Sequence, residues 1–133
     1  MIKLSKKVEY ALMALRSIKG SGENIVTAKE ISEGHNIPYD LLAKILQKLK
    51  KENILISTQG INGGYKLNTD LNIISLSNLM DMLEDNKAIV ECQQMKTDSD
   101  CIMLDDCTMK NPMEKMQKEL ESLLKSKMVS EFL

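Results

Sequence analysis

Residues 37–67 read IPYDLLAKILQKLKKENILISTQGINGGYKL, in which a basic amphipathic helix pattern is followed directly by a hairpin pattern. Pro38 favours the first position of a helix, because its missing N–H would be unpaired there in any case. The apolar residues that follow fall on one stripe, and the opposite face is polar and mostly cationic. The stripe consists of Leu41, Leu42, Ile45, Leu46 and Leu49, and the opposite face of Asp40, Lys44, Gln47, Lys48 and Lys51.

The second part of this stretch predicts a β-hairpin. The run 54–57 is short and β-prone, residues 60–64 form a glycine-rich tip, and residues 65–67 form the second run of the hairpin. Two β-prone runs around a glycine-rich turn are typical of a hairpin. A hairpin placed directly after a basic helix is the layout of a winged helix.

The residues before this stretch predict two more helices. Ser5 is a suitable N-cap for a helix whose apolar residues recur with helical spacing until Gly20. Residues 27–30 have the form of a capping box, and the short helix that they open is expected to end at Gly34. Two helices joined by a tight turn, the second with a basic face, predict a helix-turn-helix unit.

The residues after the hairpin predict a helical annex. Ser75 or Ser77 caps a short helix, residues 86–110 show no periodicity, and residues 111–133 have apolar residues at spacings of three and four. Asn111 is the expected cap of that last helix, with Pro112 at its first position. A long amphipathic terminal helix is most simply a dimerisation surface. The predicted fold is therefore mainly α with a β-hairpin wing, divided into a DNA-binding domain at 1–75 and a helical part at 76–133.

Composition limits the possible classes. The chain has 133 residues, and its longest apolar run is the six residues 10–15, against about 18 needed to span a membrane. No secretory signal pattern opens the chain, so we expect a cytoplasmic protein without a membrane partner. Residues 1–66 carry eleven basic and six acidic residues, and residues 67–133 carry seven and thirteen. The first part, with a charge of +5, suits a polyanion, and the second does not.

The lysine-rich helix has two interpretations: a solvated face or a nucleic-acid-binding surface. The hairpin and the basic first half favour nucleic acid, and double-stranded DNA in particular, because single-strand modules use aromatic stacking platforms. Aromatic residues make up only 3% of this chain. An enzyme is not expected, since the chain has one histidine and no phosphate-binding glycine motif.

Three cysteines, Cys92, Cys101 and Cys107, lie in the aperiodic region among several acidic residues. They are either small buried hydrophobes or ligands of a soft metal or an iron–sulfur cluster. The nearby acids make a loop in solvent the better interpretation. They also disfavour a lone reactive thiolate, because negative charge makes a thiol harder to ionise.

Three segments together carry a family resemblance. Residues 4–12, residues 37–49 and the Gly-x-x-Gly-Gly-Tyr sequence at 60–65, followed by three cysteines and a final helix, resemble the Rrf2 family of bacterial winged-helix regulators. The resemblance implies a homodimeric transcription factor, most simply a repressor, that binds a palindromic operator. It places the 37–49 helix in the major groove and the hairpin in the minor groove.

The resemblance also implies that the three cysteines ligate an iron–sulfur cluster, [2Fe-2S] or [4Fe-4S], whose state controls DNA affinity. Such a cluster would sense nitric oxide, redox state or iron–sulfur supply. Some members use a histidine shortly after the third cysteine as fourth ligand, where this chain has Lys110. Others use a carboxylate from the first helix of the partner subunit, and Glu9 falls at that position. The competing local ligands are Asp98, Asp100, Asp105 and Asp106.

The resemblance and the helical pattern together give a set of expected DNA contacts. Two departures alter it: Gln59 stands where the family commonly has arginine, and Ala43 where a polar base-reading residue is frequent. Two alternatives remain open, a cluster-free regulator controlled by a partner protein or thiol oxidation, and a zinc-stabilised DNA-binding module. The expected contacts are Tyr39, Lys44, Gln47 and Lys48 in the major groove, Lys6 and Lys7 on phosphates, and Gln59, Gly60, Asn62, Gly63, Gly64 and Tyr65 in the hairpin.

Overall fold

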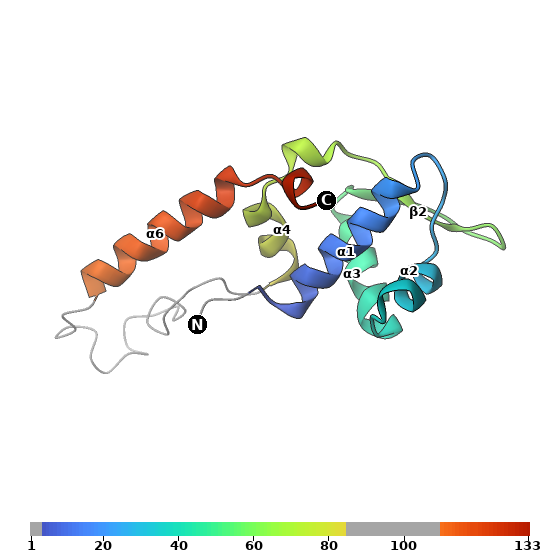
Figure 1. Ribbon diagram of the computed structural model, residues 1–133, viewed down its shortest axis with the longest axis horizontal. Helices are drawn as coiled ribbons and strands as arrows, with labels where there is room; N and C mark the ends of the chain where they lie inside the picture. Colours follow the sequence, from blue (N-terminus) through green and yellow to red (C-terminus); the bar gives the residue numbers. More distant parts are fainter. Residues whose placement is uncertain (1–3, 85–109) are drawn as a thin grey trace.

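The computed structural model describes residues 4–84 and 110–133 (Figure 1). It confirms the prediction of a mainly helical fold with one antiparallel hairpin. In chain order the elements are α1 (Lys6–Gly20), α2 (Ala28–His35), α3 (Tyr39–Lys51), β1 (Leu55–Thr58), β2 (Gly64–Leu67), the 3₁₀ turn η1 (Leu71–Ile73), α4 (Leu76–Leu83), α6 (Lys110–Ser126) and the 3₁₀ turn η3 (Val129–Phe132).

The core is built from the apolar stripes of α1, α3 and α4, which pack against one another. Leu42, Leu46 and Leu49 of α3 are completely buried, as are Val8 of α1 and Leu79 of α4. Burying each such side chain contributes about 1.5–3 kcal/mol to folding. The stripe predicted for α3 is therefore the inner face of the helix, and its polar face is turned to solvent.

The helix caps follow the sequence signals. The Ser5 Oγ accepts a hydrogen bond from the Val8 amide at 3.4 Å, and the capping box at Thr27 is complete. The N-cap of α4 is Ser75, whose Oγ accepts a hydrogen bond from the Asn78 amide at 3.1 Å, whereas Ser77 lies inside the helix and is buried. These caps satisfy amides that the helices leave free at their first turns.

The helix-turn-helix differs by one or two residues from its prediction. Gly34 was expected to end the second helix, but α2 continues through His35, and Asn36 takes the left-handed position with φ of 53°. Asparagine tolerates that conformation, and the Asn36 amide donates to the Ser32 carbonyl, so no glycine is needed there. Pro38 is the N-cap of α3 and not its first residue, since its ψ of 124° is extended.

Residues 55–67, which we call the wing, form the predicted hairpin. Leu55 pairs with Leu67 and Thr58 with Gly64 in an antiparallel ladder. A third partner was not predicted: Val26, just before α2, exchanges two backbone hydrogen bonds with Tyr65, at 2.9 and 2.7 Å. This bridge fixes the wing to the helical body.

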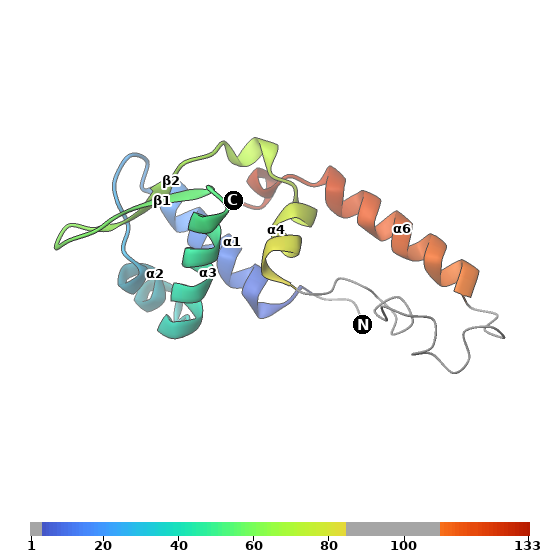
Figure 2. The same ribbon diagram turned by 180° about the vertical axis from the view of Figure 1, so that it is seen from behind.

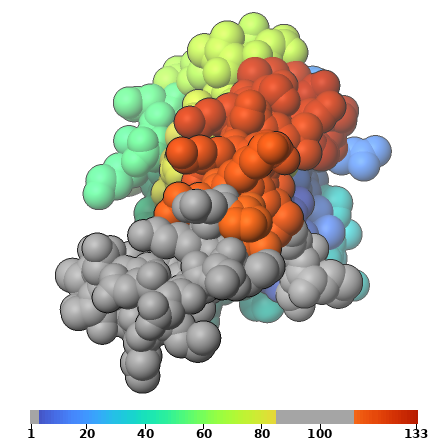
Figure 3. Space-filling view, turned by 90° about the vertical axis from the view of Figure 1, so that its left-hand side faces the viewer, coloured from blue at the N-terminus to red at the C-terminus, as the bar shows by residue number. Residues whose placement is uncertain are grey.

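The C-terminal helix is shorter than predicted. The sequence predicts it over 111–133, with Asn111 as cap and Pro112 in the first position. In the structure α6 begins at Lys110, so Asn111 and Pro112 lie inside its first turn, and it ends at Ser126, after which the last residues turn back as η3. The reason is backbone pairing: the Leu76 amide donates to the Lys127 carbonyl at 2.7 Å, and the Val129 amide to the Ile74 carbonyl at 2.8 Å. Val129 is thereby completely buried. Figure 3 shows this C-terminal turn packed between η1 and α6.

The wing and α6 project from opposite ends of the molecule, with α1, α3 and α4 between them (Figures 1 and 2). α4 packs against both α1 and α3, so the start of the predicted second domain shares the core of the first. The division at residue 75 remains a prediction. Within the two described ranges, no helix has the length and apolar character to cross a membrane.

Candidate nucleic-acid interface

The outer face of α3 carries the side chains predicted to read DNA. Lys44, Gln47 and Lys48 are exposed, and Tyr39 at the start of the helix is 55% exposed. Because the leucines on the other side are buried in the core, the orientation of this face is fixed by packing. Ala43, the predicted departure, is partly buried between the two faces.

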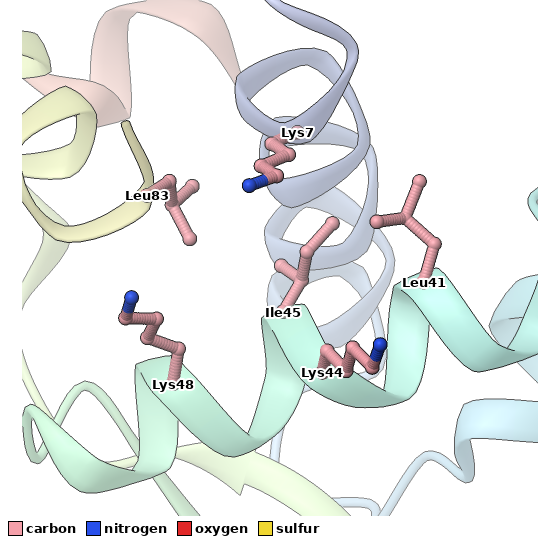
Figure 4. Close-up of a pocket in the computed structure, with 6 residues that line it drawn as sticks. All are labelled: Lys7, Leu41, Lys44, Ile45, Lys48 and Leu83. Carbon is pink, nitrogen blue, oxygen red and sulfur yellow. The ribbon is translucent and has the colours of Figure 1, made fainter. Parts of the chain in front are cut away.

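One flank of α3 is a basic hollow, which we call the cationic cavity. It lies between the start of α1, α3 and the end of α4, and has a volume of about 190 Å³ (Figure 4). Leu83 is buried, while the three lysines are exposed and bring three positive charges to one place. The structure thus brings Lys7 together with two of the α3 lysines. The cavity is lined by Lys7, Leu41, Lys44, Ile45, Lys48 and Leu83.

The wing follows the C-terminal end of α3, and its first strand, β1, packs against that helix. Tyr39 lies five positions before Lys44, about 140° around the helix. Burial raises the pKa of Tyr65 in β2, and the neighbouring Tyr39 hydroxyl adds a smaller electrostatic contribution. The Tyr65 hydroxyl therefore remains protonated at neutral pH and can donate a hydrogen bond. The two tyrosines predicted to contact DNA, one at the start of α3 and the other in β2, are therefore near enough to interact electrostatically.

Glycine is required at positions 60, 63 and 64 of the wing for different structural reasons. Gly60 has φ of 108°, a region that side chains disfavour, and its carbonyl accepts from the Gly63 amide at 3.0 Å. A Cβ at Gly63 would overlap the Thr58 carbonyl oxygen. A Cβ at Gly64 would lie 2.7 Å from the carbonyl oxygen of Val26, the residue whose backbone anchors the wing. The turn and the docking of the wing both depend on these glycines.

The tip of the wing exposes Gln59, Ile61 and Asn62. Sequence reasoning selected the polar residues and the glycines here, but not Ile61, which is fully exposed. The signal that marks Ile61 is its apolar character in a turn that otherwise contains polar residues and glycine.

Lys6 and Glu9 were predicted to bind different ligands, a DNA phosphate and a metal cluster. In the structure they bind each other, with the Lys6 Nζ donating to the Glu9 Oε2 at 2.9 Å. This hydrogen bond and the negative charge of Glu9 raise the pKa of Lys6 above its ordinary value. The pair is open to solvent, with the Lys6 side chain 73% exposed and that of Glu9 37%. Exposed pairs of this kind contribute little to stability, so either residue can exchange its partner at small cost.

The three cysteines and the competing aspartates from 98 to 106 lie outside the described residues. Among the residues that the structure does describe, no three histidine, cysteine or acidic side chains come close enough to hold a metal ion. The predicted cluster site is therefore represented in the structure by Glu9 alone.

The chain was compared with known proteins. Residues 4–133 match the Rrf2 family, described as an iron-dependent transcriptional regulator. A relative named HTH-type transcriptional regulator NsrR, from Oceanobacillus iheyensis, is 31% identical to this chain. The matched region covers 84% of this chain and 76% of the length of the relative.

Two solved structures are similar over nearly the whole chain. One is IscR from T. potens, with a TM-score of 0.71 and 25% identity over 97% of this chain and 84% of its own. The other is CymR, the global cysteine regulator of B. subtilis, with a TM-score of 0.71 and 20% identity over 98% of this chain and 95% of the CymR chain. These structures share the fold, and the family match across residues 4–133 with the 31% identical relative shows that this chain belongs to the Rrf2 family of winged-helix transcriptional regulators.

Proposed function

We propose that the protein is a homodimeric repressor that binds a palindromic double-stranded DNA operator and whose affinity is controlled by an iron–sulfur cluster. The observation that carries the DNA-binding part is the arrangement around α3. The exposed face of α3 carries Lys44, Gln47 and Lys48; it borders the cationic cavity, and β1 of the wing packs against the same helix. A helix with its polar side chains outward fits the major groove, and basic groups beside it suit the flanking phosphates.

In the proposed complex α3 lies in the major groove and the wing in the neighbouring minor groove. Gln47 is suited to the paired donor and acceptor of adenine, and lysine to the acceptors of guanine. Lys7, on α1, would reach a phosphate beside the groove, and Lys6 a second one after leaving Glu9. Phosphate contacts of this kind supply most of the non-specific affinity.

The class of nucleic acid is tested by fluorescence anisotropy with one labelled duplex and its single strands at equal length and salt. We expect the duplex to bind more tightly, because the described surface has a rigid helix and lacks a row of exposed aromatic rings. Tighter binding of the single strand, or of the matching RNA, would contradict the proposal.

Dimerisation is proposed to use one side of α6. Leu120 and Leu124 are partly buried, and α6 packs against α4. Met116 and Leu123 lie beside that inner row and remain 42% and 52% exposed. Apolar side chains on a projecting helix suit an isologous contact with a second copy of the chain.

Replacing both side chains, Met116→Glu with Leu123→Glu, is expected to convert the dimer into monomers. The change removes apolar contacts and places two carboxylates in each half of the interface, so we expect the dimer dissociation constant to rise by at least about a hundredfold. Sedimentation velocity measures it. Lys118→Gln with Lys125→Gln, on the far side of α6, changes the net charge equally and should leave the dimer intact. An unchanged dimer in the first variant would remove α6 from the interface.

The cluster part of the proposal depends on the donor set. Three thiolates with one carboxylate suit a two-iron or a four-iron cluster, and Glu9 of the partner subunit is the proposed fourth ligand. The described part of this set fits: the Glu9 side chain is 37% exposed, and its ion-pair partner among residues 4–84 and 110–133 is the exposed Lys6. A bound cluster would supply a redox-active and nitric-oxide-reactive group. Its ligation by Glu9 would also release Lys6.

Anaerobic purification is expected to yield a coloured protein with equal iron and sulfide per chain and no zinc, and nitric oxide should bleach its visible absorption. Cys101→Ala should remove the colour, since two thiolates and one carboxylate hold such a cluster poorly. Absorption spectra with iron, sulfide and zinc analysis measure both. A chain that remains colourless and iron-free after anaerobic reconstitution would contradict the cluster. Bound zinc in such a protein would then indicate a zinc-stabilised module, and its absence would indicate a regulator controlled by thiol oxidation or a partner protein.

The fourth ligand is tested separately. If Glu9 of one chain completes the site of the other, Glu9→Ala should shift the spectrum and destabilise the cluster, while Asp100→Ala should not. The reverse result would place the fourth ligand within the cysteine segment itself.

A further inference from the structure

Ile61 lies at the tip of the wing and is completely exposed. Its exposure is 103% of the reference value, the highest among the large apolar side chains in the described residues; Ile73 follows with 70%. A turn normally carries polar residues or glycine, and both neighbours of Ile61, Gly60 and Asn62, conform to that rule. An exposed isoleucine does not contribute to folding the free energy that it would contribute if it were buried.

The backbone holds this side chain outward. Gly60 has φ of 108°, and the Gly63 amide closes the turn on the Gly60 carbonyl at 3.0 Å. Gly63 has no space for a side chain against Thr58, and the Val26 bridge fixes the base of the wing. The tip therefore presents Ile61 from a defined turn at the end of the molecule that carries the wing (Figure 2).

The tip of the wing, residues 58–65, lacks the charge that a minor-groove contact commonly uses. Residues 58–65 contain no charged side chain, since Gln59 stands in place of the family's arginine. The next cation along β2, Lys66, lies 3.6 Å from the Glu23 carboxylate at the base of the wing. Attraction of a cation by the narrow groove, which an arginine would provide, is thus absent from this tip. Any affinity contributed by the tip must come from apolar contact and uncharged hydrogen bonds.

We propose that Ile61 is a minor-groove contact residue that lies against the deoxyribose walls and inserts partly at a base step. Isoleucine is among the side chains that act as apolar wedges in the minor groove, where they partly unstack a step and bend the duplex. Such a contact favours flexible pyrimidine–purine steps. It would give the operator a sequence preference at positions outside the reach of α3. The inference depends on the proposed DNA-binding function and adds a specificity-determining residue to it.

The test compares Ile61→Asn with wild type on one duplex that wild type binds. Asparagine is close in size and suits a turn, so the fold should be kept, as a melting curve will verify. We expect affinity to fall roughly tenfold, because an apolar contact is lost. The slope of log affinity against log salt should not change, because no charge is altered. Hydroxyl-radical protection of the sugars under the wing should disappear.

Ile73→Asn is the matched control. Ile73 is an exposed isoleucine on η1, outside the wing, and its replacement should leave affinity and footprint unchanged. Equal affinity and an equal footprint for Ile61→Asn and wild type would overturn the role of Ile61 while leaving the proposed function intact. A loss of affinity with a changed salt slope would also overturn it. Failure of wild type to bind any duplex would instead refute the proposed function.

Discussion

Lys44→Ala with Lys48→Ala is expected to weaken DNA binding strongly and to flatten its salt dependence. Both side chains are exposed on α3 and line the cationic cavity, so their removal leaves the core intact. A lysine in the groove neutralises nearby phosphate charge even when it contacts a base. Each neutralised phosphate contributes about 0.9 to the slope of log affinity against log salt, so the loss of two lysines lowers the slope by about 2. Anisotropy titrations on one duplex at four or more salt concentrations measure the slope.

Lys19→Ala with Lys125→Ala is the control for this pair. It removes the same charge from two other exposed lysines, in the last turns of α1 and α6. The control should change the slope far less, because charges beyond about 10 Å are largely screened at moderate salt. Equal slopes for wild type and the α3 variant would exclude this face of α3 from the interface.

Gly64→Ala is expected to detach the wing from the helical body. The added Cβ would lie 2.5 Å from the Ile25 Cγ2 and 2.7 Å from the Val26 carbonyl oxygen. The bridge between Val26 and Tyr65 must then open, and overpacking of this kind typically costs about 1–3 kcal/mol of folding free energy. DNA affinity should fall by about tenfold or more, as the wing contacts and the position of Tyr65 are lost. Chemical denaturation and anisotropy measure the two effects.

Gly34→Ala is its matched control. Gly34 lies inside α2, and a Cβ added there meets nothing within 4 Å. Alanine in a helix is favoured over glycine, so this variant should be as stable as wild type, or more so, and should bind DNA normally. A Gly64→Ala protein that matched Gly34→Ala in both measurements would show that the wing does not depend on its docking to Val26.

Local signals located the first three helices and the wing to within one or two residues. The capping residues Ser5 and Thr27 and the leucine stripe of α3 act within one or two turns of chain, and the structure confirms each of them. The α2 end was wrong because Gly34 and Asn36 both tolerate a left-handed residue, and local pattern does not choose between them. In the structure α2 continues to His35, and Asn36 takes the left-handed conformation at its C-terminal cap.

Contacts between distant segments were not predictable in the same way. Val26 pairs with Tyr65, and Val129 with Ile74, through backbone atoms that leave no side-chain pattern. The second pairing ends the C-terminal helix at Ser126, although the apolar spacing of three and four continues to Phe132. Lys7 joins the α3 lysines only because α1 packs across α3. The candidate residues of α3 were therefore predictable from sequence, whereas their grouping into one cavity was not.

In the proposed complex, α3 and the wing of a homodimer read a two-fold symmetric duplex. This claim is tested by selecting bound duplexes from a random pool with the anaerobically purified protein and sequencing them. We expect an enriched palindrome whose half-sites are spaced by about 10 base pairs or a multiple, and no such enrichment with the Lys44→Ala, Lys48→Ala variant. A pool that stays random with wild-type protein, or an enriched motif without two-fold symmetry, would contradict the claim.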